Sequence, residues 1–145
     1  MMPDAEVLVV MSSILDKLDV GSYTIKLNHR QLLDGMFQVC GVPDGKIRSI
    51  SSAVDKLDKM PWEDVKKEMV VDKGLDPAVA DRIGEYVKLS GSQELCEKLL
   101  NDPVLSANTA AKKGIEEIKT LFTYLAVFKI QHKVHTFIRK CKKRF

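Results

Sequence analysis

Apolar side chains recur along most of this chain every third or fourth residue, the spacing that gathers them on one face of an α-helix. The first such stretch covers residues 3–18 and predicts a helix that ends before Gly21. Its apolar stripe, which we expect to face the core, consists of Val7, Val10, Met11, Ile14, Leu15 and Leu18. The chain therefore opens with a helix rather than a strand.

A β-type pattern follows this helix. Residues 22–27 are rich in side chains that favour strands, and Asn28 is suited to cap a second helix. The apolar positions of that helix, which Gly41 closes, are Leu32, Leu33, Met36, Phe37 and Cys40. Because one strand leaves both of its edges unpaired, we expect this helix–strand–helix unit to need a sheet that the chain does not supply.

After a turn signal at residues 43–45 the pattern becomes purely helical. Predicted helices begin near Lys46, Trp62, Pro77, Gln93 and Thr109, with Asp76 and Ser92 as caps for the third and fourth. No repeat of about 20 to 50 residues is present, so we expect a compact helical domain rather than a solenoid. The change of pattern divides the chain into residues 1–42, residues 43–130 and a tail of residues 131–145.

Composition places the chain among soluble single-domain proteins, since its 145 residues are 45% hydrophobic and 30% charged. No apolar run reaches the roughly 18 residues of a membrane span, so we expect no membrane contact. The N-terminus shows neither the basic region of a signal peptide nor the arginine-rich composition of a transit peptide. A cytoplasmic protein is the expectation.

Charge is distributed unevenly, because residues 129–145 hold seven basic residues and no acidic one, against 16 basic and 20 acidic residues in the rest. Two interpretations of the tail remain open. One is a disordered, solvated tail without a selected partner, which we favour. The other is a segment that attracts polyanions, with stacking or membrane-surface contact from Phe137 and Phe145.

Residue types that often carry chemistry show no reactive arrangement. Cys40 and Cys96 lie among apolar helical neighbours, which is typical of buried, unreactive thiols. His29 has no nucleophile nearby, which favours a surface or capping role over acid–base catalysis. A candidate ligand set in the tail lacks the fourth ligand of zinc modules and comprises His132, His135 and Cys141. With no glycine-rich phosphate loop either, we predict no catalytic residue and no metal site.

Several segments, all in the same order, resemble histidyl-tRNA synthetases of the eukaryotic type. They are IKLNHRQLLDGMF at residues 25–37, SSAVDKLDK at 51–59, WEDVKKEM at 62–69, VADRIG at 79–84 and LFTYL at 121–125. The resemblance runs from about Pro3 to about Ile130. It implies a fold that is α+β by ancestry and mostly α in this chain: a helix–strand–helix remnant of a class II synthetase core in residues 1–42, followed by a helical insertion domain in residues 43–130.

The family's reaction is the ATP-dependent attachment of histidine to its tRNA, with magnesium as the metal. Beyond Ile130 the resemblance ends, and class II motifs 1, 2 and 3 and the anticodon-binding domain are not recognisable. We therefore predict a partial histidine-tRNA ligase that holds no cofactor and lacks catalysis on its own. The alternative is a non-catalytic tRNA-binding or protein-interaction module derived from a synthetase. The resemblance is compatible with a mitochondrial as well as a cytoplasmic parent.

The resemblance implies two kinds of partner. Synthetases of this type resemble obligate homodimers, so we expect a homodimer or pairing with a full-length protomer. Exposed apolar surface near Ile25, Leu27 and Phe37 would support either arrangement. The second partner is tRNA, because the insertion domain lies near the acceptor stem. Candidate nucleic-acid-binding residues are Lys46, Arg48, Lys56 and Lys59. Acidic residues interleave with them, a pattern also typical of a solvated helix face.

The single tryptophan, Trp62, has two interpretations. In the first turn of a predicted helix it is suited to anchor that helix in the core, which we favour. The alternative is a platform on which a nucleic-acid base stacks.

Overall fold

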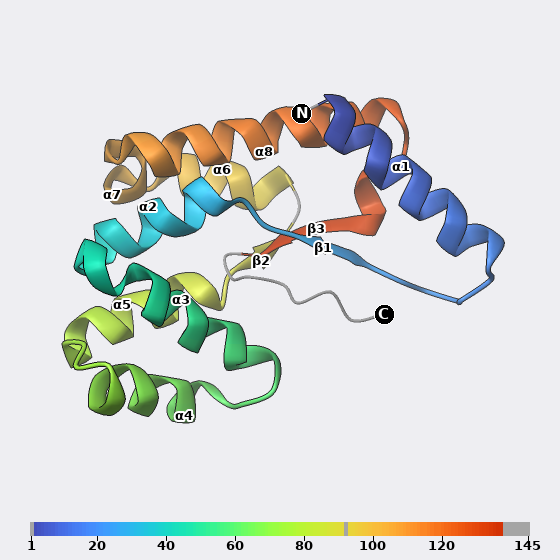
Figure 1. Cartoon of the computed structure of the whole chain (residues 1–145). Helices are drawn as coiled ribbons and strands as arrows, with labels where there is room; N and C mark the ends of the chain where they lie inside the picture. Colours follow the sequence, from blue (N-terminus) through green and yellow to red (C-terminus); the bar gives the residue numbers. More distant parts are fainter. Residues whose placement is uncertain (1, 92, 138–145) are drawn as a thin grey trace.

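In the computed structural model, which describes residues 2–91 and 93–137, helix α1 (Met2–Lys17) lies against the longest helix, α8 (Thr109–Val127) (Figure 1). The predicted helix is confirmed, but its predicted buried face is wrong. The buried residues are Ala5, Leu8 and Ser12, whereas the predicted stripe, Leu15 excepted, is exposed. The side chains of Ala5 and Ser12 are small, and small side chains let two helices approach closely, a property that hydrophobicity alone does not report.

A three-stranded sheet lies beside α1, so the expectation that the chain supplies no sheet is wrong. It consists of β1 (Ile25–Leu27), β3 (Val134–Phe137) and β2 (Ser90–Gly91), in that order across the sheet. The central strand, β3, is parallel to β1, with Ile25 opposite Val134, and antiparallel to β2, with Gly91 opposite Thr136. The partners that β1 needs therefore come from the far end of the chain.

The strand β3 also corrects the favoured interpretation of the tail as disordered. Residues 131–137 form a 3₁₀ helix, η4 (Gln131–Lys133), and then β3, in which Val134 and Thr136 are fully buried. The Lys133 ammonium donates hydrogen bonds to both carboxylate oxygens of Asp16 at 2.8 and 2.7 Å, which fixes η4 to α1. Residues 138–145, with Cys141 and Phe145, lie outside the described residues.

Helix α2 (Arg30–Cys40) packs against α8, which runs along the top of Figure 1. Its N-cap residue is His29 in an extended conformation, not Asn28 as predicted, and the His29 side chain makes no capping hydrogen bond. The helix ends at Gly41 with φ of 93°, in the left-handed region that glycine adopts without strain. A methyl group added at Gly114 would lie 2.7 Å from the Leu32 backbone nitrogen, so α2 and α8 approach closely only because residue 114 is glycine.

The helices predicted between residues 43 and 107 are present, although several are subdivided. They are η1 (Asp44–Lys46), α3 (Ile47–Val54), η2 (Asp55–Asp58), α4 (Trp62–Lys67), the π-helical segment η3 (Glu68–Asp72), α5 (Pro77–Val87), α6 (Gln93–Asn101) and α7 (Pro103–Ala107). Asp76 caps α5 as predicted, because its Oδ1 accepts from the Ala78 amide at 2.8 Å. None of the described helices combines the length and apolar character needed to cross a membrane.

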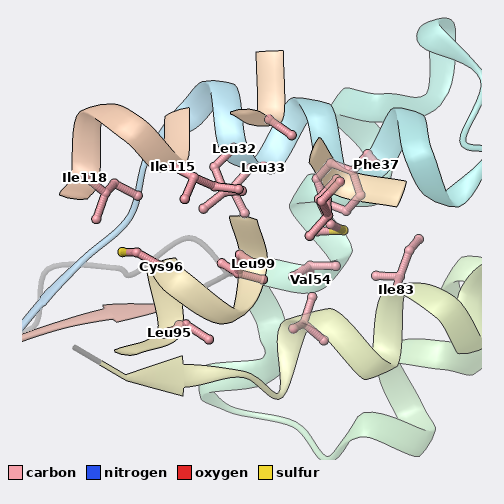
Figure 2. Packing of buried hydrophobic residues seen from close by; sticks show 14 of the residues in the cluster. Leu32, Leu33, Phe37, Val54, Ile83, Leu95, Cys96, Leu99, Ile115 and Ile118 are labelled. Carbon is pink, nitrogen blue, oxygen red and sulfur yellow. The ribbon is translucent and has the colours of Figure 1, made fainter. Parts of the chain in front are cut away.

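One hydrophobic core joins the segments. Figure 2 shows Leu32 of α2 beside Ile115 of α8 and Phe37 further along α2, with Leu99 of α6 and Ile83 of α5 on the opposite side. Residues 1–42 therefore share their core with residues of the helical segment that follows. The core takes up Phe37 and Ile25, whereas Leu27 is half-buried and lines an open hollow with Val7 and Leu121, so of the apolar surface expected near these three residues only the part at Leu27 is present. Exposed large apolar side chains are most numerous on α1, and others, such as Val71 and Val127, are scattered over the rest of the described chain.

Candidate nucleic-acid interface

Three of the four predicted nucleic-acid-binding residues, Lys46, Arg48 and Lys56, lie on η1, α3 and η2, and Lys59 directly follows η2. The buried side chains of Ile50, Ala53 and Val54 fix which face of α3 meets the core. The Ser49 hydroxyl donates to the Lys46 carbonyl oxygen at 2.9 Å and stabilises the start of the helix. Polar residues of this segment consequently face away from the core.

Lys46 has a structural role. Its ammonium donates to the backbone carbonyl oxygens of Lys73 at 3.0 Å and Gly74 at 2.9 Å, just beyond η3. Carbonyl groups at a helix C-terminus lack intrahelical partners and carry partial negative charge, so a cation stabilises them. A phosphate that drew Lys46 away would leave these two carbonyl oxygens without their donor.

Lys56 is also engaged within the protein. Its ammonium lies 2.8 and 2.7 Å from the two carboxylate oxygens of Glu68, and the Lys73 ammonium lies 3.6 Å from the same carboxylate. The hydrogen bond from Lys56 is the main cause that holds the pKa of Glu68 below its usual range. The charge of Lys56 is therefore largely neutralised before any ligand binds.

Arg48 and Lys59 differ from the other two. Both side chains are exposed, and neither has an ion-pair partner among residues 2–91 and 93–137. The structure thus divides the predicted set in two: Lys46 and Lys56 bind groups within the protein, whereas Arg48 and Lys59 form no ion pair with another described residue.

Arg48 lines an open groove of about 570 Å³ between α2 and the η1–α3 segment. The charged residues of the groove are Arg30, Arg48, Asp34, Asp44 and Asp55, and Ser51 and Ser52 add hydroxyl groups. Arg30 Nε lies 3.6 Å from Asp34 Oδ2. No pattern in the sequence indicates this groove, because its residues come from two segments that lie next to each other only in the fold.

The groove does not fit ATP and magnesium, the cofactors that the resemblance implies for the whole family. Its three carboxylates outnumber its two guanidinium groups, so the lining repels a triphosphate. Nor does any cluster of three His, Cys, Asp or Glu side chains within the described ranges form a metal site.

The remaining candidate residues for chemistry have structural environments. His29 Nε2 lies 2.7 Å from Glu117 Oε2, which links the start of α2 to α8. Cys40 and Cys96 are buried as predicted, and burial raises the pKa of each thiol to about 11. Thiols with such pKa values remain protonated at neutral pH and are poor nucleophiles.

Trp62 lies half-buried at the start of α4, where a methyl group added at Gly84 of α5 would collide with its ring. The Lys88 ammonium lies 5.9 Å from the centre of the ring. Trp62 therefore joins α4 to α5, as expected for the favoured interpretation that it anchors its helix in the core.

Comparison with known proteins identifies the family. The family model described as histidyl-tRNA synthetase matches residues 1–138. The chain belongs to the histidyl-tRNA synthetase family. The match continues beyond Ile130, so the expectation that the resemblance ends there is wrong; it continues through β3, the strand that completes the sheet with β1.

Individual members of the histidyl-tRNA synthetase family support the same assignment. The cytoplasmic histidine-tRNA ligase of Mesocricetus auratus is 55% identical over 134 residues, and the mitochondrial histidine-tRNA ligase of Homo sapiens is 53% identical over 134 residues. Each alignment covers 92% of this chain but 26% of the relative, so the chain spans about a quarter of their length. The crystal structure of histidyl-tRNA synthetase from Nostoc sp. PCC 7120 has the same fold, with a TM-score of 0.84 at 24% identity over 94% of this chain and 33% of that one.

Proposed function

We propose that this chain is one part of a histidine-tRNA ligase and that it does not form histidyl-adenylate by itself. The observation that carries this proposal is the identity of 55% over 92% of the chain combined with coverage of only 26% of the relative. Adenylate formation requires cations placed around the ATP phosphates, whereas the charged groove of this chain has an excess of carboxylates. In this proposal ATP and magnesium act in the full-length family reaction and are not held by this chain.

The first experiment is histidine-dependent exchange of pyrophosphate into ATP, measured with the purified chain. We expect no exchange above the rate without histidine, while a full-length histidine-tRNA ligase assayed in parallel is active. Exchange by the purified chain alone would contradict the proposal.

We further propose that the part played by this chain is contact with tRNA through Arg48 and Lys59. Phosphate contacts depend on charge more than on exact geometry, and exposed cations without an internal partner are suited to them. Lys46 and Lys56 support this contact indirectly, because they hold η3 against the η1–α3–η2 segment through Gly74 and Glu68.

Binding of labelled histidine tRNA and of a control tRNA, measured at about 50 and about 200 mM salt, tests this contact. We expect Arg48→Ala and Lys59→Ala each to weaken binding and to reduce its salt dependence by about one phosphate contact. Lys98→Ala is the matched control, since Lys98 is exposed on α6, away from the proposed interface. Equal loss of affinity in all three variants would contradict a specific role for Arg48 and Lys59.

Two coarser assignments, the compartment and the division of the chain into segments, accompany this proposal. We place the chain in the cytoplasm, although mitochondrial relatives match almost as well, and imaging of a tagged chain tests the compartment. We retain residues 1–42, 43–130 and 131–145 as the core segment, the insertion domain and the basic C-terminal segment, of which strand β3 pairs with β1 of the core segment. Limited proteolysis tests these boundaries: early cleavage near residue 43 is expected if the first two segments unfold separately.

A second candidate function is a protein-interaction module derived from a synthetase. The specific observation in its favour is the exposed apolar face of α1. Failure of the chain to bind any tRNA, together with self-association, would favour this function over tRNA contact.

A further inference from the structure

The open groove between α2 and the η1–α3 segment has the size and the lining of a site for a small ligand. Its volume of about 570 Å³ lies within the range of about 300 to 1,000 Å³ that is usual for such sites. Figure 1 shows α3 next to α2 in this part of the molecule. Leu33 and the half-buried Ile47 contribute apolar surface, and the other lining side chains are polar or charged. A ligand that fits the groove therefore combines an apolar surface with polar groups.

The charges of the groove argue against a protein segment as its permanent cover. The lining holds three carboxylates and two guanidinium groups, and the side chain of Arg30 is 82% exposed. The centres of protein–protein interfaces are depleted of charged residues, because another protein surface removes the water that solvates them. The groove is therefore better suited to a ligand that binds reversibly and leaves these charges partly solvated.

Arg30 and Asp34 form a mixed pair of donors and acceptors on α2. They lie one helical turn apart, with Arg30 Nε 3.6 Å from Asp34 Oδ2. A guanidinium group has only N–H donors and an ionised carboxylate has only acceptors, so the pair offers both kinds of group to the groove. The Watson–Crick edge of a nucleic-acid base also carries donors and acceptors side by side, and a guanidinium plane can stack on the base. In a double helix this edge is occupied by the paired base, so only an unpaired base can bind here.

The lining residues from α3 suit the rest of the same nucleotide. Arg48 is exposed and has no ion-pair partner among residues 2–91 and 93–137, so its charge can bind a phosphate. Ser51 and Ser52 add hydroxyl groups, which can bind the hydroxyl groups of a ribose. The three carboxylates repel further phosphates. The groove thus suits one nucleotide rather than a run of nucleotides.

We propose that this groove binds the base of one unpaired nucleotide of a bound tRNA. Arg30 and Asp34 face the Watson–Crick edge of this base, and Arg48 contacts its phosphate. The inference rests on the proposed function, because it takes contact with tRNA through Arg48 as its starting point. It adds to that contact a place where a single ribonucleotide is recognised.

Removal of the Asp34 carboxylate separates recognition of a base from attraction by charge. Asp34→Ala takes a negative charge from the groove, which strengthens binding if the tRNA is held through its phosphates alone. We expect the opposite, a loss of about tenfold in affinity for histidine tRNA, because one good pair of base contacts contributes about this much. Asp72→Ala is the matched control, since Asp72 is an exposed carboxylate at the end of η3 and outside the groove, and its affinity is not reduced. An Asp34→Ala variant that binds tRNA as tightly as the wild type, or more tightly, overturns the proposal.

Chemical probing of the bound tRNA identifies the nucleotide. Dimethyl sulfate and carbodiimide reagents modify the Watson–Crick edges of unpaired bases. The wild-type chain protects one unpaired base that is reactive in free tRNA, and Arg30→Ala at saturating concentration restores its reactivity. Because the Arg30 side chain is largely exposed, this variant folds, which its melting curve checks. Lys98→Ala on α6 is the control and keeps the protection. Bound tRNA without any protected unpaired base overturns the proposal.

The same measurements distinguish failure of this inference from failure of the proposed function. If Arg48→Ala binds tRNA as tightly as the wild type, the proposed function is wrong and this inference is wrong with it. If Arg48→Ala weakens binding but no unpaired base is protected, the contact with tRNA is made through phosphates alone. In that case the groove proposal is wrong and the proposed function stands.

Discussion

The Lys133 ammonium lies 2.7 Å from Asp16 Oδ2, and this pair joins two residues 117 positions apart in the sequence. The hydrogen bond from Lys133, followed by that from the Tyr23 hydroxyl at 2.7 Å, lowers the pKa of Asp16. The hydrogen bond to Asp16 in turn raises the pKa of Lys133. Lys133 also lies over the Tyr23 ring, 5.3 Å from its centre. The pair therefore fastens the residues preceding β3 to α1.

We expect Asp16→Asn to lower the melting temperature at neutral pH and to have little effect in acid. A carboxylate whose pKa is lowered by folding stabilises the fold above its unfolded pKa of about 4, and this contribution disappears as the pH falls through the folded pKa. Lys133, whose pKa is raised, contributes below about pH 10.4 and loses its effect as the pH rises through its folded pKa. Melting curves of the wild type and Asp16→Asn from pH 2 to 11 measure the difference. A difference that is constant across this range would contradict an ionic role.

The strand β3 and its pairing with β1 could not be predicted from the sequence, whereas the helices could. Helices depend on contacts between residues three and four apart, so the pattern located them well, including the cap at Asp76. β3 has only four residues, flanked by lysines and arginines, and it pairs with a strand more than 100 residues earlier. No local pattern identifies such a partner, and the basic composition around β3 pointed to a disordered tail.

The candidate site was predictable only in part for a different reason. The sequence shows where lysine and arginine occur, but it does not show which backbone carbonyl oxygens will lie within reach of their side chains. Lys46 is bound to two such oxygens, whereas Arg48, two positions later, has no ion-pair partner among the described residues. Similarly, the hydrophobic pattern of α1 identified the apolar positions correctly and assigned them to the wrong side, because the buried face of α1 consists of Leu8 and the small residues Ala5 and Ser12.

A second prediction concerns the close approach of α2 and α8 at Gly114. A methyl group there would lie 2.7 Å from the Leu32 nitrogen and 3.0 Å from His29 Nδ1. Alanine in place of glycine gains up to about 1 kcal/mol of helix propensity, but separating two packed helices costs more, so we expect Gly114→Ala to destabilise the protein by about 1–3 kcal/mol. Urea denaturation measures this change. Gly45→Ala is the control, since no atom lies within 4 Å of the added methyl group, and equal losses in both variants would contradict the steric argument.

A third prediction concerns Asp102, which has two structural roles. Its Oδ1 caps α7 by accepting from the Val104 amide at 2.9 Å, and its Oδ2 accepts from the Tyr86 hydroxyl at 2.8 Å. Burial acts to raise the pKa of Asp102, but these hydrogen bonds outweigh it and the pKa lies below its usual value. The carboxylate is therefore ionised and accepts both hydrogen bonds at neutral pH.

We expect Asp102→Ala to cost about 1–3 kcal/mol of stability, because it removes the cap and leaves the Tyr86 hydroxyl without its acceptor. Asp102→Asn keeps an oxygen for the cap and should cost less, and Tyr86→Phe should cost about 1 kcal/mol. Thermal and urea denaturation of the three variants give the order. If Asp102→Asn were as damaging as Asp102→Ala, charge rather than capping would be the main contribution.

The last prediction separates binding from folding among the residues of the proposed interface. We expect Lys46→Met to lower stability by about 1–2 kcal/mol, because the variant leaves the Lys73 and Gly74 carbonyl oxygens without their donor. Arg48→Met should change stability by less than about 0.5 kcal/mol, since its side chain is exposed. For tRNA affinity measured well below the melting temperature, the order reverses: Arg48→Met weakens binding, and Lys46→Met retains it as long as the variant is folded. If both variants lost stability and tRNA affinity in the same proportion, the structural role of Lys46 and the binding role of Arg48 would not be separable. The tRNA interface would then have to lie elsewhere on the chain.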